Sequence, residues 1–280
     1  MFLALCLLCG CGRESNTVFL LDTFVTIDSD CNTEELTEVI SEVSEAAEEY
    51  YDKPFSETDR LSDMFKKGEE LRAAYGDEID FRIGALTRLW NISKETPVLP
   101  SPEQIQAALA DRSYADPGAI AKGYALDCAY RTLVKTKSKR SIISAESSIL
   151  LYGEKPGGEP FKTAIKSPFI PGEFVGYIET GAAFISTSGN SERFIEIDGK
   201  RYGHIFDAKT GYPVETDLAS VTVIVPAKTP DGGIMSDFLS TLIFMRGTEG
   251  LKEFEANPDF TFLAIDKNGD IYGNQSVCSI

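Results

Sequence analysis

Residues 116–123, which read DPGAIAKG, carry groups that suit the binding of a phosphate. Asp116 precedes a glycine, and Lys122 lies about one turn into an expected helix. Free backbone N–H groups and a lysine at a helix start suit a phosphate or a pyrophosphate. The stretch is not a Walker loop, because the pattern GxxxxGK[ST] is absent. A capped helix with an exposed lysine explains the same residues at least as well.

The single histidine of the chain, His204, lies between two polar turns. Residues 186–190 (STSGN) form a hydroxyl-rich turn before it, and residues 210–213 (TGYP) form a tight turn after it. An imidazole has an unperturbed pKa near neutrality and suits a general base. One histidine excludes a His-rich zinc site and any mechanism that needs two imidazoles. The alternative is a histidine that only supports the second turn.

A third group, in residues 236–241 (SDFLST), has oxygen ligands at helical spacing. Asp237 and Thr241 are four residues apart and therefore share one face of an expected helix. Carboxylate and hydroxyl oxygens are hard ligands that suit Mg²⁺ or Ca²⁺. The alternative is an acidic residue near a helix start that interacts with the helix dipole.

The composition limits the ligand classes. With 44 acidic and 27 basic residues among 280, the formal charge is −17, which argues against nucleic-acid binding. A phosphorylated ligand then requires local positive charge, and a metal ion is the obvious source. Beyond the N-terminus, Cys31, Cys128 and Cys278 are far apart, which indicates buried free thiols rather than a zinc site or a disulfide framework.

The elements that must position these groups change in type along the chain. The first half predicts a strand at 18–28, a polar irregular segment at 53–66, and helices at 32–52, 81–90, from Ser101, and about 118–135. The second half predicts short strands at 141–145, 149–152, 162–166, 174–179, 183–187, 193–197, 202–206 and 219–225, then helices at about 236–245 and 248–256 and two final strands. Asp198-Gly199 predicts a hairpin turn. This mixture predicts an α+β fold, with mixed or antiparallel sheets and packed helices, rather than a doubly wound sheet.

The N-terminus is treated apart from the fold. Residues 1–10 are apolar and too few to span a bilayer. Leu8-Cys9-Gly10-Cys11 has the pattern of a bacterial lipoprotein signal cleaved before a lipidated Cys11, although the usual positively charged start is missing. We therefore expect a signal at 1–11, one domain at 12–280 and a lipid anchor on the extracytoplasmic face of a bacterial membrane. The alternative is a hydrophobic N-terminal strand.

The order of these motifs resembles the ApbE family of flavin transferases (FAD:protein FMN transferases), which are often lipoproteins. The resemblance runs from about Leu21 to the C-terminus. It rests on DPGAIAKGYALD at 116–127, STSGNSERFIEIDGKRYGHIFDAKTGYPV at 186–214, and SVTVIVP followed by SDFLSTLIF at 220–244. The resemblance implies the ApbE-like fold and a Mg²⁺-dependent reaction. FMN would pass from FAD to a Ser or Thr hydroxyl of an acceptor protein, and AMP would leave.

The resemblance also implies roles for individual residues. Asp116 and Lys122 would contact FAD, and Lys122 would also stabilise charge on a phosphate oxygen. His204 would be catalytic, at the FAD, and would take the proton of the incoming hydroxyl. The backbone carbonyl of Ala119 would join Asp237 and Thr241 around Mg²⁺. Asp80 (in IDFRIG, 79–84) would lie near the nucleotide, and Thr23 would lie near the flavin.

The chain departs from the family pattern in several places. The usual N-x-G-G-[DS] is Ser-Ala-Glu-Ser-Ser at 144–148, so Glu146 adds negative charge near an anion if it points inward. The other departures are Leu21-Asp22-Thr23 for Met-Gly-Thr, Phe65 for an Asn, and Gly203 and Ala208 for a His and a Pro. Two other functions stay open: an FAD pyrophosphatase that yields FMN and AMP, and a flavin-binding lipoprotein without turnover.

Overall fold

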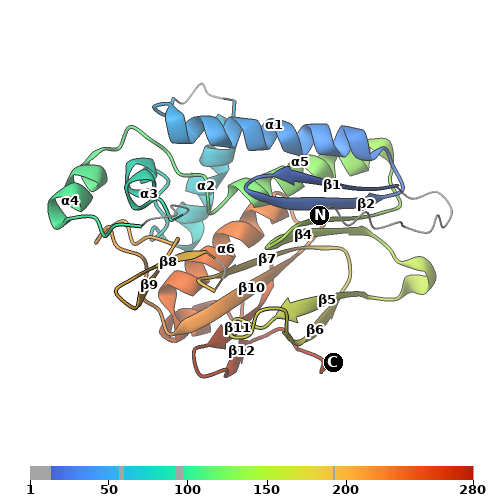
Figure 1. Cartoon of the computed structure of the whole chain (residues 1–280). Coiled ribbons are helices and arrows are strands. Elements are labelled where there is room, and N and C mark those ends of the chain that lie inside the picture. The colour runs from blue at the N-terminus through green and yellow to red at the C-terminus, as the bar shows by residue number, and fades with distance from the viewer. Residues whose placement is uncertain (1–13, 57–59, 93–96, 192, 280) are drawn as a thin grey trace, which may run out of the picture.

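The protein is built around one eight-stranded antiparallel sheet, in a computed structural model that describes residues 14–56, 60–92, 97–191 and 193–279. The order across the sheet is β1-β2-β3-β4-β7-β10-β11-β12 (Figure 1). These strands are β1 (Glu14–Leu20), β2 (Thr23–Ser29), β3 (Arg140–Ala145), β4 (Ser148–Gly153), β7 (Ala183–Gly189), β10 (Leu218–Pro226), β11 (Thr261–Asp266) and β12 (Ile271–Gly273). The expected α+β fold is confirmed.

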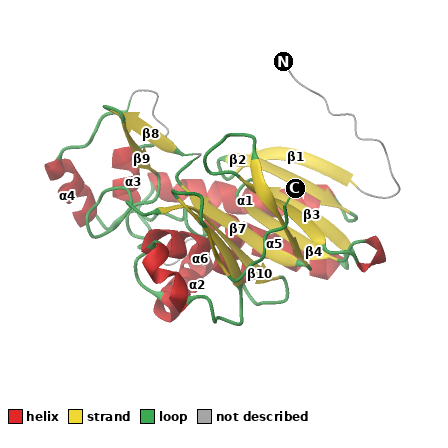
Figure 2. Cartoon of the chain, turned by 90° about the horizontal axis from the view of Figure 1, so that it is seen from below, coloured by secondary structure: helices red, strands yellow, loops and turns green. Residues whose placement is uncertain are grey.

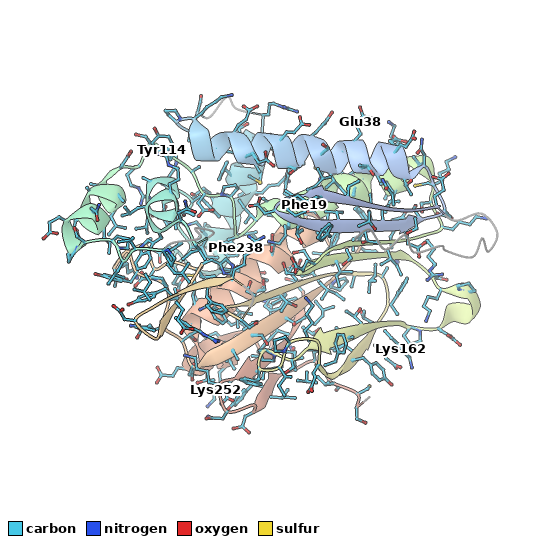
Figure 3. The ribbon with its side chains drawn as sticks, viewed as in Figure 1. Phe19, Glu38, Tyr114, Lys162, Phe238 and Lys252 are labelled. Carbon is cyan, nitrogen blue, oxygen red and sulfur yellow. The ribbon has the colours of Figure 1, made fainter. Side chains whose placement is uncertain are left out.

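Helices cover one face of this sheet. The main ones are α1 (Thr33–Asp52), α5 (Ala121–Thr136) and α6 (Gly232–Arg246), with α2 (Ser62–Tyr75) beside α6. Their apolar side chains share a core with alternate residues of the strands, such as Val221 and Val223 of β10. Phe238 of α6 is fully buried in this core, whereas Glu38 lies on the outer side of α1 (Figure 3).

Two hairpins and two short helices complete the molecule. The hairpin of β5 (Phe161–Lys166) and β6 (Phe174–Thr180) follows a short 3₁₀ turn (Pro156–Gly158) and packs Phe161 and Ile178 on the opposite face of the sheet. The hairpin of β8 (Phe194–Ile197) and β9 (Lys200–Gly203) groups with α3 (Gly84–Trp90) and α4 (Pro102–Ala110) at one end of the molecule (Figure 2). A second 3₁₀ turn, Thr248–Glu253, follows α6.

Several local expectations are confirmed. The helix predicted at 32–52 begins after Asn32, which accepts a hydrogen bond from the N–H of Glu34, and the helix predicted from Ser101 begins with a capping box between Ser101 and Gln104. Asp198-Gly199 forms the turn between β8 and β9. Cys31, Cys128 and Cys278 are free thiols, half-buried rather than buried. The predicted lipoprotein signal at 1–11, including Cys11, lies outside the described residues, among which no helix is long and apolar enough to cross a membrane.

Three expectations are wrong in detail. The strand at 18–28 is a hairpin, because Leu21 and Asp22 both have positive φ (55° and 57°) and reverse the chain. The irregular segment at 53–66 already contains the start of α2, a mostly polar helix that buries only Met64, Phe65 and Gly68. Helix α6 starts at Gly232, four residues before the predicted start, so Asp237 lies in its second turn.

Helices α5 and α6 cross at van der Waals contact of their backbones. A Cβ on Gly123 would lie 2.2 Å from the carbonyl oxygen of Gly233, and a Cβ on Gly233 would lie 2.3 Å from that of Gly123. Both distances are well below any real carbon–oxygen contact, so only glycine fits at either position. Asp127 of α5 accepts hydrogen bonds from the N–H groups of Gly233 and Ile234, each at 2.8 Å, and thereby caps the start of α6.

Candidate functional site

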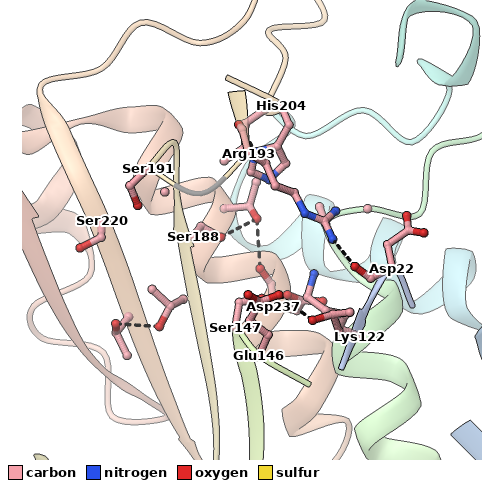
Figure 4. Close-up of a pocket in the computed structure, with 18 of the residues that line it drawn as sticks. Asp22, Lys122, Glu146, Ser147, Ser188, Ser191, Arg193, His204, Ser220 and Asp237 are labelled. Atoms are coloured by element: carbon pink, nitrogen blue, oxygen red, sulfur yellow. Dashed lines mark hydrogen bonds between the residues drawn. The ribbon is translucent and has the colours of Figure 1, made fainter. Parts of the chain in front are cut away.

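One cleft of about 1190 Å³ receives every residue for which a site role is predicted. Its walls come from the β1–β2 turn, the β3–β4 turn, the start of α5, the end of β7, the loop after β9 and the side of α6 (Figure 4). The predicted residues that line it are Thr23, Asp80, Asp116, Ala119, Lys122, His204, Asp237 and Thr241. Segments more than two hundred residues apart in the sequence therefore meet in one place.

Asp237 is held by partners on two other elements, α5 and β4. Its Oδ2 accepts a hydrogen bond from the N–H of Gly123 at 2.9 Å, and its Oδ1 faces the hydroxyl of Ser148 at 3.4 Å. Ser148 in turn faces Ser186 at 3.3 Å, and Ser186 bonds to Ser236 at 2.9 Å. These serines are completely buried, so they fix the carboxylate orientation. A simple interaction of Asp237 with the dipole of its own helix does not describe this geometry.

The three predicted metal ligands present only oxygen atoms. The hydroxyl of Thr241 lies 3.0 Å from that of Ser188 and 3.3 Å from the carbonyl oxygen of Asp237. Gly123 would be the usual i→i−4 donor to the carbonyl of Ala119, but its N–H bonds to Asp237 instead. The Ala119 carbonyl therefore keeps its lone pairs at the cleft. One carboxylate, one hydroxyl and one carbonyl form a donor set that fits Mg²⁺.

No group of three or more His, Cys, Asp or Glu side chains suited to a metal occurs among the described residues. A site built on Asp237 agrees with this finding, because it uses a single acidic side chain. The donor chemistry also argues against a soft transition metal, since neither a thiol nor an imidazole belongs to the set.

The stretch 116–123 forms a tight turn before α5. Asp116 accepts a hydrogen bond from the N–H of Gly118 at 2.7 Å with one carboxylate oxygen and a short hydrogen bond from the hydroxyl of Thr87 with the other. Both oxygens therefore hold the turn in shape. Lys122 lies in the first turn of α5 and lines the cleft, and no carboxylate lies within ion-pair distance of it among the described residues.

His204 is neutral in the free protein at pH 7. Burial, together with the nearby charges of Lys122 and Arg193, lowers its pKa to about 4. The His204 imidazole therefore does not keep its unperturbed pKa in the fold. Nδ1 lies 3.2 Å from the carbonyl oxygen of Arg193, and a carbonyl can only accept a hydrogen bond. The proton thus sits on Nδ1, and Nε2 carries the free lone pair.

Thr23 and Asp80 line the cleft but are already bonded to other residues. The buried Thr23 donates its hydroxyl to Oε2 of Glu146 at 2.5 Å. Asp80 pairs with the guanidinium of Arg112 at 2.5 Å and accepts from the N–H of Arg82 at 2.8 Å. Arg112 therefore offsets the negative charge of Asp80 at the edge of the cleft.

Sequence patterns did not identify the cleft residues Glu146 and Arg193, or Ser148 behind Asp237, as functional. Glu146, noted only as a departure from the family pattern, does line the cleft, at the tip of the β3–β4 turn with φ of 55°. Ser148 closes the hydroxyl chain behind Asp237. Arg193 reaches across the cleft mouth to the β1–β2 turn. Their signals are weak because a glutamate, a serine and an arginine near strands are ordinary surface residues.

A family model decides the classification. The model described as the ApbE family matches residues 19–263, which is most of the chain. This chain belongs to the ApbE family. The resemblance found from the sequence motifs is confirmed.

The ApbE fold is also shared with solved structures. The ApbE protein of Thermotoga maritima superposes with a TM-score of 0.80 over 93% of this chain and 96% of its own, at 24% identity. The flavin transferase ApbE of Vibrio cholerae gives a TM-score of 0.76 over 94% and 97%, at 23% identity. At these identities the structural likeness establishes the fold.

Curated ApbE relatives carry one activity in their names. The FAD:protein FMN transferase of Salmonella typhimurium is 28% identical over 256 residues, covering 77% of this chain and 73% of that protein. The FAD:protein FMN transferase of Haemophilus influenzae is 27% identical over 300 residues, covering 91% and 84%.

Proposed function

We propose that this chain is an FAD:protein FMN transferase. It binds FAD in the cleft, transfers FMN to a Ser or Thr hydroxyl of an acceptor protein and releases AMP. The observation that carries the proposal is the convergence of Asp237, Thr241, Ala119, Lys122 and His204 in one cleft. At about 1190 Å³ the cleft exceeds the usual range for drug-sized ligands and suits a dinucleotide. Family membership and the names of the relatives support the same activity.

The donor set of Asp237, Thr241 and Ala119 would hold Mg²⁺. When bound, this ion would neutralise charge on the diphosphate of FAD, which a chain with a charge of −17 cannot do by its overall field. Ser148 and Gly123 keep the Asp237 carboxylate turned toward this position. Lys122 supplies a second positive charge from the first turn of α5.

His204 acts as the general base. The hydroxyl oxygen of the acceptor attacks the FMN phosphorus, the bond from that phosphorus to the AMP oxygen breaks, and the hydroxyl proton moves to Nε2. The hydrogen bond from Nδ1 to the Arg193 carbonyl keeps the imidazole in the required tautomer. A bound diphosphate beside Lys122 and Arg193 would offset their charges and so remove two of the causes that lower the pKa of His204.

The test uses the full chain, FAD, Mg²⁺ and a Thr-containing acceptor domain, followed by intact mass measurement of the acceptor and quantification of AMP. We expect one FMN unit on the acceptor and an equal amount of AMP. FMN and AMP without a protein adduct would identify an FAD pyrophosphatase. Bound but uncleaved FAD would identify a flavin carrier and overturn the proposal.

The pyrophosphatase alternative differs only in the nucleophile, because water would take the place of the acceptor hydroxyl. The carrier alternative draws some support from Glu146, whose charge opposes FAD binding. Against the carrier stands the buried hydroxyl chain behind Asp237, since a passive flavin pocket has no need of a fixed carboxylate there.

We further propose that the protein is a lipoprotein anchored through Cys11 on the extracytoplasmic face of a bacterial membrane. The motif Leu8-Cys9-Gly10-Cys11 supports this location. Several acyl chains are needed, because a single chain anchors only marginally. Mass spectrometry of the native N-terminus tests the proposal. An unlipidated Met1 in protein isolated from its native membrane would contradict it.

A further inference from the structure

Arg193 connects two walls of the cleft. Its guanidinium donates a hydrogen bond to the backbone carbonyl of Asp22 in the β1–β2 turn at 3.0 Å, across 171 residues of sequence. Its own backbone carbonyl accepts the hydrogen bond from His204. Figure 4 shows the side chain extending from beside His204 across the mouth of the cleft to Asp22. The guanidinium therefore lies near both the general base and the opening.

The charge of Arg193 has no acidic partner. In the described part of the chain no carboxylate lies within ion-pair distance of its guanidinium, although other arginines, such as Arg112, Arg201 and Arg246, form such pairs. A chain with 44 acidic residues could easily supply a partner. The single bond to a neutral carbonyl leaves most of its five N–H donors free. Such a group gains more from an anion than from the contact it makes now.

We propose that Arg193 binds the FMN-side phosphate of the flavin nucleotide, leaving the carbonyl of Asp22 when the nucleotide enters. This inference deepens the proposed function and rests on it. The planar guanidinium fork matches two phosphate oxygens at once, which an ammonium group cannot do. The FMN-side phosphate is the one that must lie near His204, and the backbone of Arg193 holds that histidine. Arg193 and Lys122 then share the charge of the diphosphate.

The test compares ligands that differ by one phosphate. Riboflavin and FMN are titrated by flavin fluorescence, in Mg²⁺, into the wild type, Arg193→Gln and Arg193→Lys. FMN has no diphosphate to cleave, so turnover does not interfere. We expect Arg193→Gln to weaken FMN binding about 10- to 100-fold and riboflavin binding less than twofold, with the lysine variant between. The salt dependence of FMN binding should also decrease in Arg193→Gln.

The matched control is Arg201→Gln. Arg201 lies on the same β8–β9 hairpin, pairs with Glu196 and is not part of the cleft lining. Its loss should leave both affinities unchanged. Equal weakening of riboflavin and FMN in Arg193→Gln would overturn the inference, because it would mean that Arg193 only holds the β1–β2 turn.

These binding measurements separate the inference from the function. If the wild type does not transfer FMN but Arg193→Gln selectively loses FMN affinity, the transferase proposal fails and the phosphate role stands. If transfer occurs and Arg193→Gln binds FMN normally, the phosphate role fails and the transferase proposal stands. Melting temperatures of all variants confirm that the comparison is made on folded protein.

Discussion

Asp127 and Asp237 each accept a hydrogen bond from the backbone N–H of a glycine on the other's helix. Asp127 of α5 bonds to Gly233 of α6, and Asp237 of α6 bonds to Gly123 of α5. Each aspartate follows the glycine of its own helix by four residues, so the pair of contacts is reciprocal. Only Asp237 lines the cleft. One carboxylate thus fixes the helix crossing, and the other turns the same crossing into a site.

Replacing Asp127 by Asn should lower the stability of the protein. Asp127 accepts from both Gly233 and Ile234, whereas an amide has one acceptor oxygen and would oppose the second N–H with its NH₂ group. Chemical denaturation checks this expectation. An unchanged unfolding midpoint would show that the start of α6 does not need the cap.

The same variant should change the pH dependence of stability. Burial raises the pKa of Asp127 to about 7, from 3.8 in the unfolded chain. The folded state therefore holds an extra proton between these values, and this contribution is lost as the pH rises through 7. The stability difference between wild type and Asp127→Asn should shrink from pH 5 to pH 8. A constant difference would contradict the raised pKa.

Asp237→Asn should abolish Mg²⁺-dependent transfer while the protein stays folded. The amide oxygen can keep the hydrogen bond from Gly123, but the negative charge that a cation requires is gone. The loss should exceed the roughly 10- to 100-fold effect typical of residues behind a metal ligand. Ser148→Ala is the matched comparison and should show that smaller effect. Initial rates over a Mg²⁺ titration measure both, and wild-type rates at low Mg²⁺ for Asp237→Asn would refute the assignment.

His204→Ala should reduce single-turnover transfer by about 10²- to 10⁴-fold and still bind FAD. The pKa of His204 in the protein without FAD is about 4. The value of kcat/KM for FAD of the wild type should therefore show no titration of His204 between pH 6 and 8. Melting temperature and rate are measured on the same sample. A variant that is less stable but transfers at a near-normal rate would reduce His204 to a support for the turn at 210–213.

Glu146→Gly and Glu146→Gln should both tighten FAD binding, because each removes a negative charge from a cleft that takes a polyanion. The two variants differ in the backbone strain at position 146. Glu146 has φ of 55°, which glycine adopts without strain, but glycine also removes the acceptor of the buried Thr23 hydroxyl, so Glu146→Gly should gain no stability. Glu146→Gln keeps an acceptor for Thr23 and should leave stability unchanged. Weaker FAD binding in both variants would show that Glu146 contacts the ligand favourably.

The site residues that belong to short local motifs are the ones that the sequence predicts best. Asp116, Lys122, His204, Asp237 and Thr241 were selected from short patterns, and all line one cleft. The helix starts at Asn32 and Ser101 are also predicted correctly, because capping depends on residues that are three or fewer positions apart.

The structural features that the sequence does not predict depend on contacts between distant residues or on an unusual backbone conformation. Leu21-Asp22 contains no Gly or Asn, so the turn that splits the predicted strand gave no signal. The order of the sheet, in which β4 pairs with β7, follows from the three-dimensional packing of the β5–β6 hairpin on the other face. Arg193 was missed because its partner, Asp22, lies 171 residues away.

The contact between Gly123 and Gly233 also constrains the order of folding. The hydrogen bond from Gly123 to Asp237 spans 114 residues, so the cleft requires one of the slow, long-range closures of the chain. During synthesis, the phosphate-binding turn and α5 leave the ribosome long before α6 exists. Until α6 docks, Asp127 has no helix to cap and the N–H of Gly123 has no carboxylate to bond to. A growing chain therefore gains its ligand site only after α6 has been made and has docked on α5.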